Sequence, residues 1–307
     1  MGLARHRETF GAPRHLQLPF LGRRRQRLGD PLQSERRLHL DLRAGRSRGP
    51  GTFRARLPPQ AAGCEEGGGM RAARSMNGLR RDVALANRII ERFGLSGAFG
   101  HVSARIPGTD RFYFPTRRSP GLASAGELLV LDTEGKILSG KGTPNSELWI
   151  HARLYAARPD VGGVVHAHPP ASICLTQIGQ PHRVVHNQGG AFHAGVPEFE
   201  RISLIRTREL GDLLARKLGA GLAVMMRGHG ITTALPDVRA ATVAACMLEE
   251  SAGMQLRMLA AAGGDPARIR VYTREEAESM GDQVGPRVVE RAWEYYSIAA
   301  EARPLGR

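Results

Sequence analysis

Hydrophobic positions begin to repeat regularly only from about residue 77 of this 307-residue chain. Between residues 79 and 93 they recur every three or four positions, which predicts an amphipathic helix that Gly94 ends. Short alternating or apolar runs separated by turn residues follow, and they predict antiparallel strands joined in hairpins. The regular part of the chain is therefore expected to begin with a helix and a small sheet.

Further along, helices alternate with single strands. A helix is expected after Asn145 or Ser146, either of which can be its N-cap, and a strand then runs into His166. After a loop, a helix and a buried strand lead into the glycine turn at residues 227–230, and a long Ala-rich helix capped by Asp237 follows. One or two more helices complete the order. This order predicts an α/β fold, a three-layer α/β/α single domain with a central, mostly antiparallel sheet.

The first 69 residues differ from the rest in pattern and in charge. They show no helical or strand period, and they hold 14 arginines, six acidic residues and no lysine, about half of the net charge of +15. We expect this segment to be disordered. It can be a non-native extension from a start codon assigned too early, a nucleic-acid-binding arm or a transit peptide; we favour the first, because Met70 and Met76 lie just before the periodicity begins. The catalytic domain is then expected over residues 77–265, and the helices of residues 266–307 should complete that domain or a subunit interface.

Composition limits where the protein works and what it binds. No apolar run approaches the roughly 18 residues that a membrane-spanning helix needs, and the N-terminus lacks the apolar segment of a secretory signal. The three cysteines are odd in number and widely spaced, so they indicate neither a disulfide framework nor a zinc knuckle. We therefore expect a cytoplasmic protein with no membrane partner. Nucleic acid is not an expected partner either, because the basic excess is concentrated in the doubtful first 69 residues.

The sequence His-Ala-His follows one of the predicted strands. Residues i and i+2 of a strand point to the same side, so His166 and His168 should project together while Ala167 faces away. Two imidazoles on one face can share a metal ion, although histidines at strand ends are often only hydrogen-bonded. Pro169 and Pro170 should end the strand, which predicts that the pair lies at an edge of the sheet.

Two other positions are candidates for the same site. His229 stands between two glycines after a buried apolar run, where the backbone can approach closely, and it is either a third ligand or a simple turn histidine. Glu147 lies at the start of a helix, where the helix dipole already favours a carboxylate. His151 shares its helix face, but Glu-x-x-x-His is not the spacing of the zinc proteases, so we do not count it as a ligand.

Four stretches together resemble the class II aldolase/adducin family, and they occur in the order and approximate spacing of that family. They are GHVSAR (100–105), PNSELWIHARLYAARPDVGGVVHAHP (144–169), RTREL (206–210) and RGHG (227–230). The resemblance implies the α/β/α single domain, commonly a homotetramer with active sites between subunits. It also implies one divalent metal per subunit, Zn²⁺ or Mn²⁺, held by His166, His168 and His229, with Glu147 as the acid/base.

The resemblance further implies a metal-dependent carbon–carbon lyase that acts on a small-molecule carboxylate or aldol. The cation would stabilise the negative charge left when the bond breaks, and Glu147 would move the proton with a pKa raised by burial. Decarboxylation of a hydroxy-(hetero)aromatic acid is slightly favoured over aldol cleavage. The alternatives are a sugar-phosphate 4-epimerase and a non-catalytic adducin-like interaction domain, and the three histidines with Glu147 argue against the latter.

The positions that hold a phosphate in the sugar-phosphate members are altered here. Gly100-His101 replaces a Gly-Asn pair, and Ser146 keeps only one serine of another pair, with Asn145 in place of its partner. Substrate contacts are expected from Gly100, His101, Arg117, Arg118, Ser119, Asn145 and Ser146. The two arginines can bind some other anion. Tyr295 and Tyr296 are candidates to supply a phenol from a neighbouring subunit.

Overall fold

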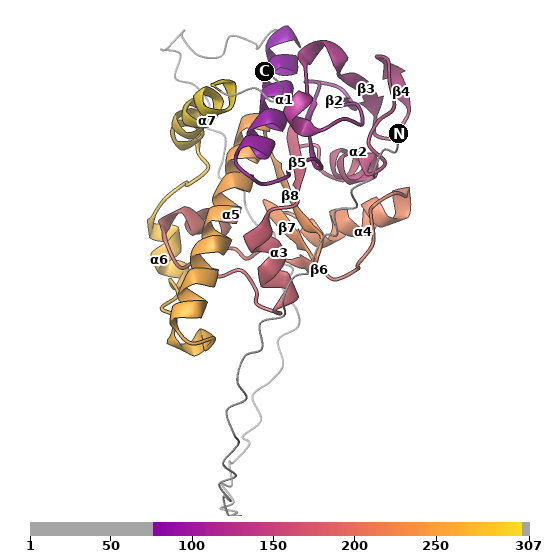
Figure 1. Cartoon of the computed structure of the whole chain (residues 1–307). Coiled ribbons are helices and arrows are strands. Elements are labelled where there is room, and N and C mark those ends of the chain that lie inside the picture. The colour runs from indigo at the N-terminus through magenta and orange to yellow at the C-terminus, as the bar shows by residue number, and fades with distance from the viewer. Residues whose placement is uncertain (1–75, 303–307) are drawn as a thin grey trace, which may run out of the picture. The chain divides into compact units, whose positions relative to one another are not determined.

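Residues 76–302, which are those that the computed structural model describes, form one sheet with helices on both of its faces (Figure 1). The expectation for residues 1–69 lies outside these described residues. The helices are α1 (Met76–Arg92), α2 (Leu148–Ala157), α3 (Pro170–Gln177), α4 (Arg208–Leu218), α5 (Val238–Ala261), α6 (Arg274–Ser279) and α7 (Pro286–Glu301). The strands are β1 (His101–Arg105), β2 (Arg111–Phe114), β3 (Leu129–Asp132), β4 (Ile137–Ser139), β5 (Gly163–Ala167), β6 (Glu198–Phe199), β7 (Ala223–Met226) and β8 (Gly230–Leu235).

The sheet places the His-Ala-His strand near its middle. The strand order is β4-β3-β2-β1-β5-β8-β7-β6, and all neighbours are antiparallel except β6 and β7. His166 on β5 lies opposite His101 on one side and Thr232 on the other. The histidine pair lies where β5 ends, as predicted from the prolines that follow it, and this strand is a central one.

Each face of the sheet has its own hydrophobic core. Helices α1, α5 and α7 pack on one face around Val165 and Ala167, and helices α2 and α4 pack on the other face around Val164. Because side chains alternate along a strand, His166 shares the second face with Val164 while Ala167 points into the first core. The predicted three-layer α/β/α domain with a mostly antiparallel sheet is confirmed.

Of the two N-caps predicted from the sequence, that of α5 is confirmed and that of α2 is wrong. Asp237 is the predicted cap of α5, and its Oδ1 accepts hydrogen bonds from the backbone of Arg239 and Ala240 at 2.8 and 2.9 Å. The N-cap of α2 is Glu147, without a side-chain cap bond, so the expectation of Asn145 or Ser146 there is wrong. The Asn145 Oδ1 instead accepts a hydrogen bond from the Glu147 N–H at 2.9 Å, which forms a turn before the helix.

Three elements of the sheet region were not predicted. Helix α3 starts at Pro170, directly after the histidines, because the fixed φ of proline and its missing N–H suit the first turn of a helix. Strand β8 completes a hairpin with β7 around the glycine turn and also pairs with β5. The third element, β6, has only two residues, too few to leave a hydrophobic period.

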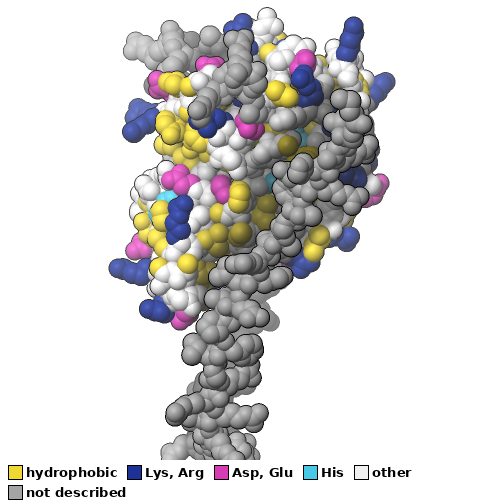
Figure 2. Space-filling view, in the orientation of Figure 1, with side chains coloured by type: hydrophobic (Ala, Val, Ile, Leu, Met, Phe, Trp, Pro, Cys, Tyr) yellow, Lys and Arg dark blue, Asp and Glu magenta, His cyan; other side chains and the backbone are white. Residues whose placement is uncertain are grey.

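The described surface shows no sign of a membrane span. Among residues 76–302, no helix is long and apolar enough to cross a bilayer. On the face of the molecule in Figure 2, the visible Lys and Arg side chains are scattered and alternate with Asp and Glu. The described side chains visible there therefore form no continuous basic stripe of the kind that follows a nucleic-acid backbone.

Candidate metal centre and substrate pocket

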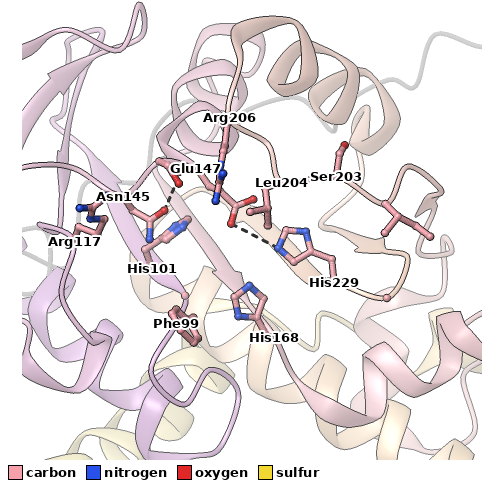
Figure 3. A pocket seen from close by; sticks show the side chains of 14 residues that line it. Phe99, His101, Arg117, Asn145, Glu147, His168, Ser203, Leu204, Arg206 and His229 are labelled. Atoms are coloured by element: carbon pink, nitrogen blue, oxygen red, sulfur yellow. Dashed lines mark hydrogen bonds and ion pairs between the residues drawn. The ribbon is translucent and has the colours of Figure 1, made fainter.

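Three histidines and one glutamate meet where β5 ends. Glu147 begins α2, His166 lies on β5, His168 directly follows that strand, and His229 lies in the turn between β7 and β8. One potential ligand atom of each residue lies within 4.8 Å of those of the others. Figure 3 shows Glu147 and His229 joined across the pocket with His168 beside them. The fold thus assembles all four residues that the sequence singled out for this site.

The β7–β8 turn approaches the histidine pair so closely that it needs a glycine at its end. The backbone N–H of His229 donates to the Met226 carbonyl oxygen at 2.9 Å, which closes the turn. A Cβ on Gly230 would collide with the carbonyl group of Ala167 and would lie 3.1 Å from the His168 ring. The absence of a side chain at residue 230 is therefore what lets His229 reach the other two histidines.

Substituting Gly230 with alanine is expected to disturb the site and to destabilise the protein. The added methyl group meets main-chain atoms that cannot turn away, so we expect a loss of about 1–3 kcal/mol in the free energy of unfolding and weaker metal binding. Gly253→Ala is the matched control, because its Cβ would meet only the Ala171 Cβ at 3.7 Å and alanine favours a helix. Thermal unfolding and metal content measure both variants, and equal stability of the two would contradict the explanation.

The histidine nitrogens are arranged to accept a cation. The His166 Nδ1 lies 3.0 Å from the Ile231 carbonyl oxygen, so it carries the proton and leaves a lone pair on Nε2. Burial, followed by the neighbouring His101, lowers the pKa of His166 well below its ordinary value, which keeps the ring neutral. Its Nε2 lies 3.1 Å from the His168 Nε2, and the buried Nε2 of His229 has no hydrogen-bond partner among the described residues.

Such nitrogens are costly to bury unless something binds them. Imidazole nitrogens with free lone pairs and a carboxylate are the ligand types that divalent transition metals prefer. A metal-binding histidine is usually oriented by a hydrogen bond from its other ring nitrogen, and the His166 Nδ1 makes such a bond to the Ile231 carbonyl oxygen. The four residues present therefore fit a divalent metal ion.

Glu147 is ionised in this setting. Its Oε1 accepts a hydrogen bond from the Ile205 N–H at 2.9 Å, and its Oε2 lies 3.6 Å from the His229 Nε2 and 3.7 Å from the His166 Nε2. Burial by itself raises the pKa of this carboxyl group, but the close imidazoles of His229 and His166 and the hydrogen bond from the Ile205 N–H together lower it to about 2. The expectation of a raised pKa is wrong, because it considered burial and not these neighbouring groups.

A pocket of about 590 Å³ opens beside the four residues. Gly100, His101, Arg117, Asn145 and Ser146 line it, as expected for substrate contacts. The other two expected contacts, Arg118 and Ser119, are not among its lining residues, and Arg118 forms an ion pair with Glu127 at 2.9 Å instead. The two tyrosines of α7 do not line the pocket of this chain either; Tyr295 and Tyr296 both have ring contacts with Phe93.

Several lining residues were missed by sequence reasoning. The exposed apolar side chains Phe99, Ile202 and Leu204 stand at the pocket, with 69% of Phe99 and 70% of Ile202 accessible. Arg206 lines it as well, and Figure 3 shows Arg117 and Arg206 at different positions around it. Arg206 was part of the RTREL stretch, so a signal was present, whereas the three apolar residues lie in loops that have no period.

Comparison with known proteins agrees with this geometry. Residues 81–256 match the family described as Class II Aldolase and Adducin N-terminal domain. This chain belongs to that family. The expected relationship is confirmed, and the solved structure of an aldolase II superfamily protein from Pseudomonas syringae shares the fold, with a TM-score of 0.65 and 23% identity over 76% of this chain and 95% of that one.

Relatives in the class II aldolase family include both decarboxylases and aldolases. A 3,4-dihydroxyphthalate decarboxylase of Arthrobacter keyseri is 33% identical over 204 residues, which are 61% of this chain and 81% of the relative. A 5-methylthioribulose-1-phosphate/5-deoxyribulose-1-phosphate aldolase of Rhodospirillum rubrum is 27% identical over 66% of this chain and 93% of the relative. Both reactions break a carbon–carbon bond.

Proposed function

We propose that this protein is a metal-dependent decarboxylase of a hydroxylated aromatic acid that carries a second anionic group. It is a carbon–carbon lyase of the class II aldolase type, as expected, and its relatives include 3,4-dihydroxyphthalate decarboxylases. The observation that supports the finer statement is the pocket lining. Apolar side chains suited to an aromatic ring stand there with two arginines that have no acidic partner among the described residues.

The metal would be held by His166, His168 and His229, and we propose Zn²⁺ or Mn²⁺. Imidazole ligands suit zinc, and an added carboxylate oxygen suits manganese. A divalent cation bound there supplies positive charge that stabilises the electrons left on the substrate when the carbon–carbon bond breaks. His166 is fully buried on β5, and the other three residues of the cluster, Glu147, His168 and His229, line the pocket.

Glu147 would carry one proton through the reaction. Its lowered pKa keeps Glu147 ionised, so it begins in the form that can accept a proton, and the cation would make the substrate hydroxyl group acidic enough to give its proton up. Carbon dioxide then leaves with the bond to the ring broken, and the electron pair remains on the substrate. Glu147 returns its proton to that ring carbon, and the oxygen that lost its proton regains one from water.

Arg117 and Arg206 would hold the anionic group that is not lost. A guanidinium binds a carboxylate through two parallel hydrogen bonds, which fixes the orientation of the ring as well as its position. The segment carrying Arg117 is held next to the Asn145 turn by the backbone bond from the Arg117 N–H to the Thr143 carbonyl oxygen at 2.8 Å. The arginine is thus placed by the same turn that places Glu147.

Removing either pocket arginine is expected to weaken substrate binding more than turnover. A hydrogen bond to a charged group contributes about 1.5–3 kcal/mol, so Arg117→Met and Arg206→Met should each raise KM about 10-fold to 100-fold with a smaller change in kcat. Arg118→Met is the matched control, because that neighbour pairs with Glu127 and does not line the pocket. Steady-state kinetics decide the point, and an equal rise in KM for all three variants would contradict these roles.

A substrate panel tests the proposed function against the reactions of other relatives. The purified protein is given 3,4-dihydroxyphthalate, monocarboxylate analogues with one hydroxyl group, L-fuculose 1-phosphate and a pentulose 5-phosphate. We expect carbon dioxide from the dicarboxylate and slower release from the monocarboxylates. Aldehyde from the sugar phosphate without carbon dioxide would establish an aldolase, a changed pentulose would establish an epimerase, and no turnover with bound metal would favour the adducin-like module.

The quaternary and cellular expectations stay predictions. A homotetramer with active sites between subunits would place a neighbouring chain beside the exposed Phe99 and Ile202 at the pocket. A cytoplasmic location follows only from the composition. The division of the chain into residues 1–69, 77–265 and 266–307 also stays a prediction.

A further inference from the structure

A second group of polar residues lies buried directly beneath the candidate metal centre. The His151 Nε2 lies 2.7 Å from the His101 Nδ1, and the His151 Nδ1 lies 2.6 Å from the Ser103 Oγ. The Ser103 Oγ in turn lies 2.8 Å from the Tyr155 hydroxyl. All four side chains are almost completely inaccessible to solvent, and the His101 ring lies 5.1 Å from the His166 ring, centre to centre.

At Tyr155 and Ser103, only one arrangement of the hydrogen atoms satisfies both hydroxyl groups. The Tyr155 phenol stays protonated, because burial raises its pKa. Its own hydrogen then has one acceptor among the described residues, the Ser103 Oγ. If Ser103 donated to the phenol instead, the Tyr155 hydrogen would be buried without an acceptor, which is unfavourable.

Because Tyr155 donates to Ser103, the directions of the hydrogen bonds from Ser103 to His151 and from His151 to His101 are fixed as well. Ser103 accepts from Tyr155, so its own hydrogen goes to the His151 Nδ1. Burial lowers the pKa of His151 to about 3, so this ring is neutral and keeps its single proton on Nε2. That proton is donated to the His101 Nδ1, and the proton of a neutral His101 must then be on Nε2.

His101 is also a lining residue of the pocket. The bond to His151 is made by its Nδ1, and its Nε2 forms no hydrogen bond among residues 76–302. An N–H with no protein acceptor at a pocket is available to an oxygen of a bound molecule.

We propose that Tyr155, Ser103 and His151 form a one-way chain of hydrogen bonds that holds the proton of His101 on Nε2 and presents it to a substrate oxygen beside the metal centre. His101 is the group that touches the substrate, and the other three are positioning residues. The identity of that oxygen, a carboxylate oxygen, rests on the proposed function. A donor fixed in advance favours an acceptor there and disfavours a group that can only donate, such as an ammonium.

A double-substitution experiment separates positioning from a general structural role. We expect His101→Phe to lower kcat/KM for 3,4-dihydroxyphthalate about 10-fold to 100-fold, and Ser103→Ala to lower it about 10-fold. In the His101→Phe background, adding Ser103→Ala should change kcat/KM less than about twofold, because the chain then has nothing to orient. The same tenfold loss in both backgrounds would overturn the proposal.

Ser251 provides the matched control for Ser103. It is also a fully buried serine bonded to a buried histidine, since its Oγ lies 2.8 Å from the His182 Nε2, and neither residue lines the pocket. Ser251→Ala should leave kcat/KM unchanged within about twofold. A tenfold loss in this variant would show that any buried serine–histidine pair has this effect and would overturn the proposal.

Neutron diffraction from crystals of the deuterium-exchanged full chain tests the proton positions without any turnover. Deuterium is expected on Nε2 and not on Nδ1 in both His101 and His151. Deuterium on the His101 Nδ1 would refute the proposed chain of hydrogen bonds even if the protein decarboxylates its substrate. The expected pattern in a protein that releases no carbon dioxide would refute the proposed function and leave the chain of hydrogen bonds standing.

Discussion

Replacing His166 with alanine is expected to remove both the bound metal and the activity. His166 is the most rigidly held of the ligands, since it is fully buried on a central strand and its Nδ1 donates to the Ile231 carbonyl oxygen at 3.0 Å. Losing its Nε2 breaks the set of three nitrogens. The transition-state stabilisation supplied by a cation is several kcal/mol, so kcat/KM should fall about 10³-fold or more.

Elemental analysis of the purified His166→Ala variant measures the loss of bound metal. The metal content should fall from about one ion per subunit to near zero, and carbon dioxide release should fall with it. His182→Ala is the control, because it also removes a buried imidazole, one that bonds to Ser251 and does not line the pocket. A His166→Ala variant that keeps its full metal content would show that the ion is bound elsewhere.

Glu147→Gln is expected to separate proton transfer from metal binding. The amide has nearly the same shape, and its oxygen can still accept the hydrogen bond from the Ile205 N–H, so the start of α2 should keep its position. The amide cannot take up and return a proton, however. We expect the metal content to stay within about twofold of the unaltered protein while kcat falls about 10²-fold to 10⁴-fold, the usual contribution of a general acid–base group.

Metal content and kinetics measured on one preparation decide between two roles of Glu147. Loss of activity with retained metal supports the role in moving the proton. Loss of both together would mean that Glu147 acts mainly as a fourth ligand. Activity within tenfold of the unaltered protein would contradict both roles and would leave the ionised carboxylate without a function in the reaction.

Most of the helices and the shared direction of His166 and His168 could be predicted because their signals are local. The period from residue 79 to residue 93 is a property of one helix, and the position of Asp237 before an Ala-rich run is a property of one helix end. The alternation in His-Ala-His likewise needs only the geometry of one strand. That these residues share one site with Glu147 and His229 came from the resemblance to a family, not from the pattern.

The remaining features depend on contacts between distant residues, which no local pattern records. The pKa of Glu147 is set partly by the N–H of Ile205, which is 58 positions away along the chain. Arg117 lines the pocket, whereas Arg118 forms an ion pair with Glu127, nine positions further along the chain. The two prolines after β5 were read only as the end of the strand, but they also begin α3, with Pro169 as its N-cap and Pro170 as its first residue.

Carbon dioxide release before and after removal of the metal tests the central claim most directly. The purified protein is assayed with 3,4-dihydroxyphthalate, treated with a chelator, assayed again, and then given back one equivalent of Zn²⁺ or Mn²⁺ per subunit. We predict one carbon dioxide per substrate consumed, loss of the activity on chelation, and its return with at least one of the two ions but not in the His166→Ala variant. Full release of carbon dioxide from the metal-free protein would contradict the account.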